Sequence, residues 1–111
     1  MSVSRLSKLL QFMEQDPNDP FILYALATEY NNLNNTAEAF QFYLKLISEH
    51  PSYLGTYYHL GKLYEKQNET DQAISIYQQG MEVANNKRDM HTLSELRTAF
   101  NSASGLDYED D

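Results

Sequence analysis

The chain contains three histidines and no cysteine, so histidine is the first residue type to consider for metal binding or acid–base catalysis. His50 stands before Pro51 at a predicted helix end, where a cation can interact with the helix dipole. We interpret His59 and His91, which lie 32 residues apart, as having no carboxylate at metal-ligand spacing beside either of them. We therefore predict no metal site and no catalytic histidine.

Motifs for nucleophiles and for phosphate binding are also missing from the sequence. No serine stands in the Gly-x-Ser-x-Gly turn that exposes the nucleophile of many hydrolases. The chain has only 4 glycines, and none of them forms a Gly-rich phosphate loop. We therefore predict that the protein is not an enzyme and uses no cofactor.

Acidic residues outnumber basic residues, 16 against 8, and give a formal net charge of −8. Binding to phosphates requires a surplus of Lys and Arg, so we predict that neither nucleic acid nor an anionic membrane is a partner. The N-terminal segment has no apolar run of signal-peptide length, and no stretch approaches the ~20 apolar residues of a membrane span. The length of 111 residues suits one domain, and the expected location is cytoplasmic.

The elements that would position a binding site are predicted from a pattern that occurs twice. Each copy has a large residue, a leucine, a small residue and an aromatic on one helix, then a small residue one turn before an aromatic on a second helix. One copy comprises Tyr57, Leu60, Gly61, Tyr64, Ala73 and Tyr77, and the other, 34 residues earlier, comprises Leu23, Leu26, Ala27, Tyr30, Ala39 and Tyr43. In length and residue types this pattern resembles the tetratricopeptide repeat.

The resemblance implies an all-α fold, an α-α superhelix of antiparallel helix pairs with about six helices. We expect a tetratricopeptide-like domain over residues 1–105 and an acidic tail over residues 106–111. The expected parts of the domain are a half-repeat at 2–17, a repeat at 20–53, a repeat at 54–86 and a C-terminal capping helix at 87–103.

Capping residues predict where the helices begin and end. Asp19 and Pro20 suit a helix start, Asn34 can adopt the left-handed conformation that ends a helix, and Gly105 suits another end. Asn35 and Glu38 could form a capping box. The expected helices run from Ser2 or Ser4 to before Asp16, from Pro20 to about Leu33, from Thr36 to His50, from about Tyr53 to Gln67, from Thr70 to Ala84 and from about Lys87 to Ser102.

Small residues are expected where helices approach closely, and tyrosines where the core is filled. Small side chains allow helix axes to come within the ~8–10 Å of ordinary helix packing. The small positions are Ala27, Ala39, Gly61 and Ala73, and the core aromatics are Tyr30, Tyr43, Tyr64 and Tyr77.

In tetratricopeptide repeats the first helices of successive repeats line a concave groove that receives a peptide or a helix of a partner. The resemblance implies that the second, fifth, ninth and twelfth residues of each unit face this groove. Counted from Pro20, Leu54 and Lys87, these are Phe21, Tyr24, Thr28 and Asn31, then Gly55, Tyr58, Lys62 and Glu65, then Arg88, His91, Glu95 and Thr98. Tyr24, Tyr58 and His91 would form a row of rings suited to a binding hot spot. Alternatively, each ring packs on the next helix and only fills space.

One branch of the family binds the C-terminal aspartates of heat-shock chaperones through a clamp of Lys, Asn and Arg side chains. At the clamp positions this chain has Tyr24, Thr28, His59 and Thr92, and only Arg88 is chemically suitable. The two-carboxylate clamp is therefore absent.

The resemblance implies a protein–protein interaction module whose partner is another protein or a peptide. The alternative is self-association into a homo-oligomer through the apolar edges of incomplete terminal repeats. The acidic tail is expected to be solvated, and a second interpretation is an electrostatic arm that covers Lys62 or Arg88.

Overall fold

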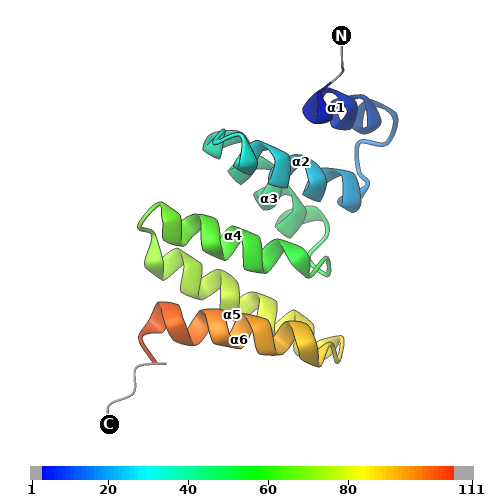
Figure 1. Ribbon diagram of the computed structural model, residues 1–111. Coiled ribbons are helices and arrows are strands. Elements are labelled where there is room, and N and C mark those ends of the chain that lie inside the picture. The colour runs from blue at the N-terminus through cyan, green and yellow to red at the C-terminus, as the bar shows by residue number, and fades with distance from the viewer. Residues whose placement is uncertain (1–3, 107–111) are drawn as a thin grey trace. The chain divides into compact units, whose positions relative to one another are not determined.

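The computed structural model describes residues 4–106, and this part of the chain contains helices and no strands (Figure 1). The all-α prediction with about six helices is thereby confirmed for these residues. The chain divides into two compact units, Met1–Tyr53 and Leu54–Asp111, each of which is described by itself. The first unit contains α1 (Arg5–Gln15), α2 (Pro20–Asn32) and α3 (Thr36–Glu49), and the second contains α4 (Gly55–Lys66), α5 (Thr70–Asn86) and α6 (Met90–Ser104).

Three helices begin at a side chain that accepts a hydrogen bond from a free backbone N–H. Ser4 Oγ accepts from Ser7 N at 3.0 Å, and Asp19 Oδ1 accepts from Phe21 N at 2.9 Å. Asp89 caps α6 by accepting from the backbone N–H of Thr92 at 3.1 Å. These bonds satisfy donors that the helix itself leaves unpaired.

The helix ends use residues that tolerate positive φ. Asn34 follows α2 with φ 63°, and Asn68 follows α4 with φ 64°, so the two repeats end their first helices in the same way. Gly105 ends α6 in the left-handed conformation with φ 77°. The predictions for Asn34 and Gly105 are confirmed, because asparagine and glycine adopt this conformation with less strain than other residues.

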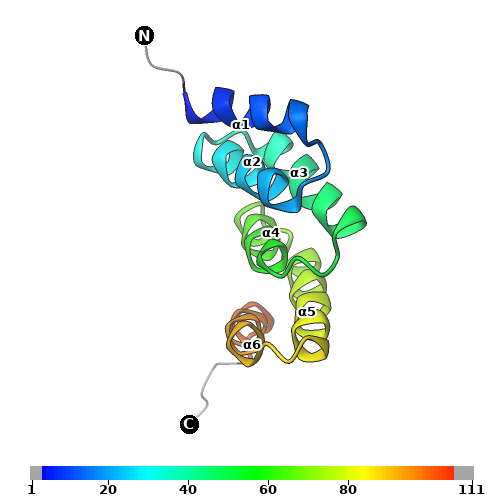
Figure 2. The same cartoon turned by 90° about the vertical axis from the view of Figure 1, so that its right-hand side faces the viewer.

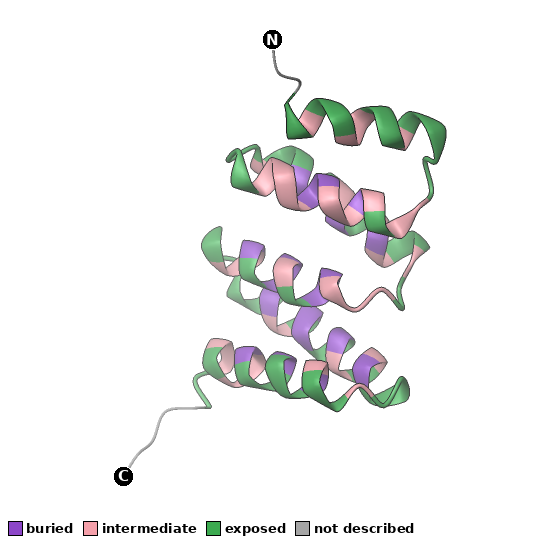
Figure 3. Ribbon diagram, turned by 45° about the vertical axis from the view of Figure 1, so that its right-hand side comes forward, coloured by how far each residue is buried: buried purple, intermediate pink, exposed green. Residues whose placement is uncertain are grey.

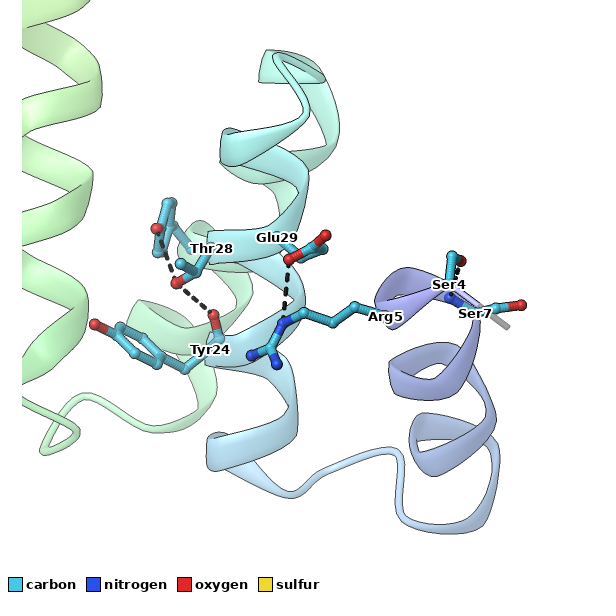
Figure 4. Close-up of polar contacts among 7 residues, drawn as sticks. Ser4, Arg5, Ser7, Tyr24, Thr28 and Glu29 are labelled. Carbon is cyan, nitrogen blue, oxygen red and sulfur yellow. Dashed lines mark hydrogen bonds and ion pairs between the residues drawn. The ribbon is translucent and has the colours of Figure 1, made fainter. Parts of the chain in front are cut away.

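The first unit is built around the α2–α3 pair. Its fully buried side chains are Leu23, Leu26, Ala27, Ala39, Tyr43 and Leu46. The helix α1 packs on α2 but has no buried residue of its own (Figure 3). An ion pair between Arg5 Nε and Glu29 Oε1, at 3.2 Å, joins α1 to α2 (Figure 4).

In the second unit, α4 and α5 meet through two reciprocal contacts between a glycine and a tyrosine. A Cβ placed on Gly61 of α4 would lie 2.1 Å from Cε1 of Tyr77, and one placed on Gly80 of α5 would lie 2.5 Å from Cβ of Tyr57. Each helix therefore supplies one glycine and one tyrosine to the pair. Ala73 is also fully buried, as the sequence predicted.

The core tyrosines differ in how deeply they are buried. Tyr43 and Tyr77 are fully buried, whereas Tyr30 and Tyr64 are half-buried at the edge of the core. The ring of Tyr30 stacks on Phe42 with centroids 5.7 Å apart. The hydroxyl of Tyr77 donates to Glu65 Oε2 at 2.5 Å, so this buried ring ends at a polar partner on α4.

Two sequence-based expectations about helix ends are wrong. The helix α5 continues to Asn86 and α6 begins at Met90, whereas a helix from Lys87 was expected. Arg88 takes φ 59° in the turn, and the Asp89 carboxylate provides the cap that Lys87 has no acceptor to supply. The capping box expected at Asn35 is absent, since the Asn35 side chain makes no capping hydrogen bond.

Between residues 4 and 106, none of the helices combines the length and the apolar character needed to cross a membrane. The acidic tail expected from residue 106 onward lies, from residue 107, outside the described residues.

Replacing either buried glycine tests the contact between α4 and α5. In open space, Gly→Ala would stabilise a helix by up to ~1 kcal/mol. Because Tyr77 and Tyr57 occupy the required volume, we expect Gly61→Ala and Gly80→Ala each to lower the free energy of unfolding by ~1–3 kcal/mol. Urea unfolding followed by circular dichroism measures this, with the exposed Ser75→Ala on α5 as the control. A stability equal to that of the control variant would contradict the interlocked packing.

The buried tyrosines predict a loss of stability at alkaline pH. Burial raises the pKa of Tyr43, Tyr57 and Tyr77, and for Tyr77 the bond to Glu65 adds to the effect. The unfolded chain ionises its tyrosines near pH 10, whereas the folded chain keeps these phenols protonated to higher pH. Their contribution to stability is therefore complete below about pH 9 and is lost as the pH rises above about 10.

Urea unfolding between about pH 8 and about pH 11 should show this fall, and Tyr77→Phe should make it less steep. The comparison between parent and variant cancels the titration of lysines, which both proteins share. Parallel stability curves for the two proteins would refute the assignment to Tyr77.

Candidate functional site

A hollow of about 510 Å³ lies between α4 and α6 in the second unit. The two helices pack against each other, with α5 on their other side (Figure 2). The residues that line the hollow are Tyr58 and His59 from α4 and His91, Ser94, Glu95 and Thr98 from α6. Its volume falls within the ~300–1,000 Å³ of sites that bind small ligands or side chains of a partner.

Four of the lining residues occupy positions that the sequence assigned to a groove. Tyr58 is the fifth residue of the repeat that starts at Leu54. His91, Glu95 and Thr98 are the fifth, ninth and twelfth residues of the half-repeat that starts at Lys87. His59 and Ser94 line the same hollow but were not predicted to do so. His59 follows Tyr58 in the sequence and Ser94 precedes Glu95, so a prediction that included the residues next to each groove position would have found both.

Tyr58 offers an accessible ring at this site. Its side chain is 36% exposed, and its ring meets that of His59 edge-on with centroids 5.6 Å apart. The ammonium of Lys62 lies 5.5 Å from the Tyr58 centroid, within the range of a cation–π contact. Tyr58 is thus held from two sides without being buried.

Each of the two helices that border the hollow carries a polar contact between side chains about one helical turn apart. On α6, His91 Nε2 lies 3.2 Å from Glu95 Oε2, one helical turn away. The interpretation that His91 has no carboxylate at ligand spacing is therefore wrong. On α4, Lys62 Nζ lies 3.9 Å from Glu65 Oε2, the oxygen that also accepts from the Tyr77 hydroxyl.

The two lining histidines differ in their surroundings. His59 is half-buried, and this burial lowers the pKa of its imidazole, so His59 is neutral at pH 7. The side chain of His91 is 84% exposed. His50, the third histidine, ends α3 in the first unit and is not part of this site.

The groove positions of the first unit lie on α2. Phe21 is 67% exposed, whereas Tyr24 is half-buried with its ring 5.4 Å from that of Tyr53. Thr28 is half-buried, and its hydroxyl donates to the Tyr24 carbonyl at 3.0 Å (Figure 4). Asn31 is also half-buried. Tyr24 thus packs on a ring of the loop that precedes α4, not on the next helix.

Arg88 and Gly55 do not line the hollow. Arg88 lies in the turn before α6, and Gly55 is the first residue of α4. Through the described part of the chain, no three His, Asp or Glu side chains are grouped so that they could hold a metal ion.

Comparisons with known proteins agree with this architecture. Two sequence profiles described as tetratricopeptide repeat match the chain, one over residues 32–96 and one over residues 8–41. A comparison with curated proteins found no match.

Among solved structures, the chain is similar to a tetratricopeptide repeat domain protein from Salinibacter ruber. Its solution structure is 46% identical over 86% of this chain and 97% of that chain, with a TM-score of 0.78. A crystal structure from the same organism, also of a tetratricopeptide repeat domain protein, is 47% identical over 80% of this chain and all of that one (100%), with a TM-score of 0.75.

A protein from Bordetella parapertussis shares the fold with a TM-score of 0.80 at 17% identity, over 96% of this chain and 92% of that one. One profile spans more than half of the chain, and the two structures from Salinibacter ruber are nearly half identical to it. The chain therefore belongs to the tetratricopeptide repeat family.

Proposed function

We propose that this protein binds a peptide or a helical segment of another protein, and that the hollow between α4 and α6 is part of the binding site. Tetratricopeptide repeat domains are generally protein–protein interaction modules and generally have no catalytic activity. The observation that carries the proposal is that groove positions from two helices, Tyr58 on one and His91, Glu95 and Thr98 on the other, line a single hollow.

The composition of the hollow suits a side chain of a protein partner. An exposed tyrosine supplies apolar contact area at low entropic cost, and tyrosine is enriched among hot-spot residues. The hydroxyls of Ser94 and Thr98 and the carboxylate of Glu95 supply hydrogen-bonding groups on the α6 side of the hollow. A guest side chain would therefore be held by one apolar surface and oriented by several polar groups.

In the first unit, the predicted groove positions on α2 include two aromatic rings, Phe21 and Tyr24. Phe21 is the more exposed of the two predicted rings there, while Tyr24 packs on Tyr53. We therefore propose Phe21 as a contact residue, and the participation of Tyr24 stays a prediction. The Tyr24→Ala variant described below tests the predicted row of rings that Tyr24 forms with Tyr58 and His91.

A second candidate function is self-association, which is favoured by exposed apolar side chains near both ends of the chain. Phe12 on α1 is 54% exposed, and Met90 at the start of α6 is 53% exposed. Such residues can pair between subunits when no other element covers them.

Peptide display on the immobilised protein tests the proposed binding function. A selected peptide should shift the backbone amide resonances of Tyr58, Ser94 and Thr98, and the double variant Tyr58→Ala/His91→Ala should weaken its binding by about tenfold or more. Gln78→Ala, on the exposed surface of α5, is the matched control and should bind normally. Failure to select any peptide, or equal binding by the double variant, would contradict the proposal.

Adding Tyr24→Ala to Tyr58→Ala tests the predicted row of rings. If Tyr24 also contacts the peptide, the pair should bind more weakly than Tyr58→Ala alone while the helix content stays unchanged. Equal binding by the pair and by Tyr58→Ala alone would remove Tyr24 from the site.

Sedimentation velocity separates peptide binding from self-association. If the protein acts as a monomer, its sedimentation coefficient should not depend on protein concentration. A dimer that appears with rising concentration, and that Met90→Asp or Phe12→Asp abolishes, would favour the second function.

A further inference from the structure

The hollow between α4 and α6 is rich in hydrogen-bond acceptors. Glu95 is the one carboxylate among its six lining residues, and none of the six is lysine or arginine. An ionised carboxylate offers about four acceptor positions, of which the contact with His91 uses one. At 56% exposure, the Glu95 side chain is accessible to a guest.

Thr98 adds a second acceptor, because its own proton is already used. The Thr98 hydroxyl donates to the Ser94 carbonyl at 3.0 Å, which leaves the lone pairs of the oxygen available. Glu95 and Thr98 lie three residues apart on α6, so their acceptors stand on one face of the helix. A guest that only donates hydrogen bonds suits this face.

The cation nearest in sequence to this face of α4 is Lys62, which does not itself line the hollow. Its ammonium lies 3.9 Å from Glu65 Oε2 and 5.5 Å from the centroid of the Tyr58 ring, so this ring already accepts a cation. His59 brings no positive charge, because burial keeps its imidazole neutral at pH 7. The fixed charge of the lining is therefore that of Glu95, and it attracts a cation.

We propose that the hollow receives an arginine side chain of the partner segment, an inference that rests on the proposed peptide-binding function. The guanidinium would bond to Glu95 and Thr98 and stack against the ring of Tyr58. Arginine has five donors and no acceptor, pairs with carboxylates in a forked geometry and stacks on aromatic faces. A carboxylate guest would instead meet Glu95 as a like charge.

The test uses peptides selected by display that shift the resonances of Ser94 and Thr98. These peptides should share an arginine at a fixed position. Replacing that arginine by citrulline, which is neutral and of nearly the same shape, should weaken binding by about fivefold, as expected for an accessible ion pair. Glu95→Gln should cause the same loss, and citrulline should cause no further loss in that variant.

The variant Lys62→Gln provides a second test, in which the affinity for an arginine peptide should rise instead of fall. Removing this neighbouring cation should strengthen the binding of an arginine peptide, whereas it would weaken the binding of an acidic one. Glu82→Gln, on the exposed surface of α5, is the matched control for loss of a carboxylate and should have no effect. Thermal unfolding of the three variants checks that their folds are equally stable.

The possible outcomes separate this inference from the proposed function. Peptides that bind the hollow without an arginine, or that bind Glu95→Gln as well as the parent, would overturn the inference and leave peptide binding standing. Weaker binding of the selected peptides by Lys62→Gln would overturn it as well. Failure to select any peptide would overturn both.

Discussion

The second unit depends on one steric constraint, the reciprocal fit of two tyrosine rings over two glycines between α4 and α5. The Tyr77 ring occupies the space of a Cβ at Gly61, and Tyr57 occupies that space at Gly80. Because each helix gives one ring and one gap, the two contacts fix how far one helix can slide along the other. Interiors packed at this density do not absorb an added methyl group without a shift of their neighbours.

The same constraint decides which side chains remain available for binding. Tyr57 turns to α5, so the next two residues of α4, Tyr58 and His59, face the hollow that α4 shares with α6. The hydroxyl of the fully buried Tyr77 donates to Glu65 on α4, whose side chain is partly exposed. Packing in the core and the chemistry of the accessible face are thus linked through neighbouring residues on α4.

Much of the fold could be predicted, because the recurrence after 34 residues places the same residue types at the same helical positions. It identified the buried Gly61 and Ala73 and the left-handed Asn34. It missed Gly80, because the first repeat carries Leu46 at the equivalent position, and it missed the start of α6 after Asp89. A comparison of the two repeats finds only positions where both have the same type of residue, so it does not find a close contact that one repeat makes with a glycine and the other does not.

At the site, the amino-acid order alone specifies which side chains share a face of one helix, since the helical period fixes their directions around the helix axis. His91, Glu95 and Thr98 share a face of α6 by that rule, and the resemblance to the tetratricopeptide repeat assigned them and Tyr58 of α4 to a groove. The packing of the helices determines that residues of α4 and α6 line one hollow, that Arg88 lies in a turn outside it and that Tyr24 packs on Tyr53. Those facts depend on contacts between helices, which no local period specifies.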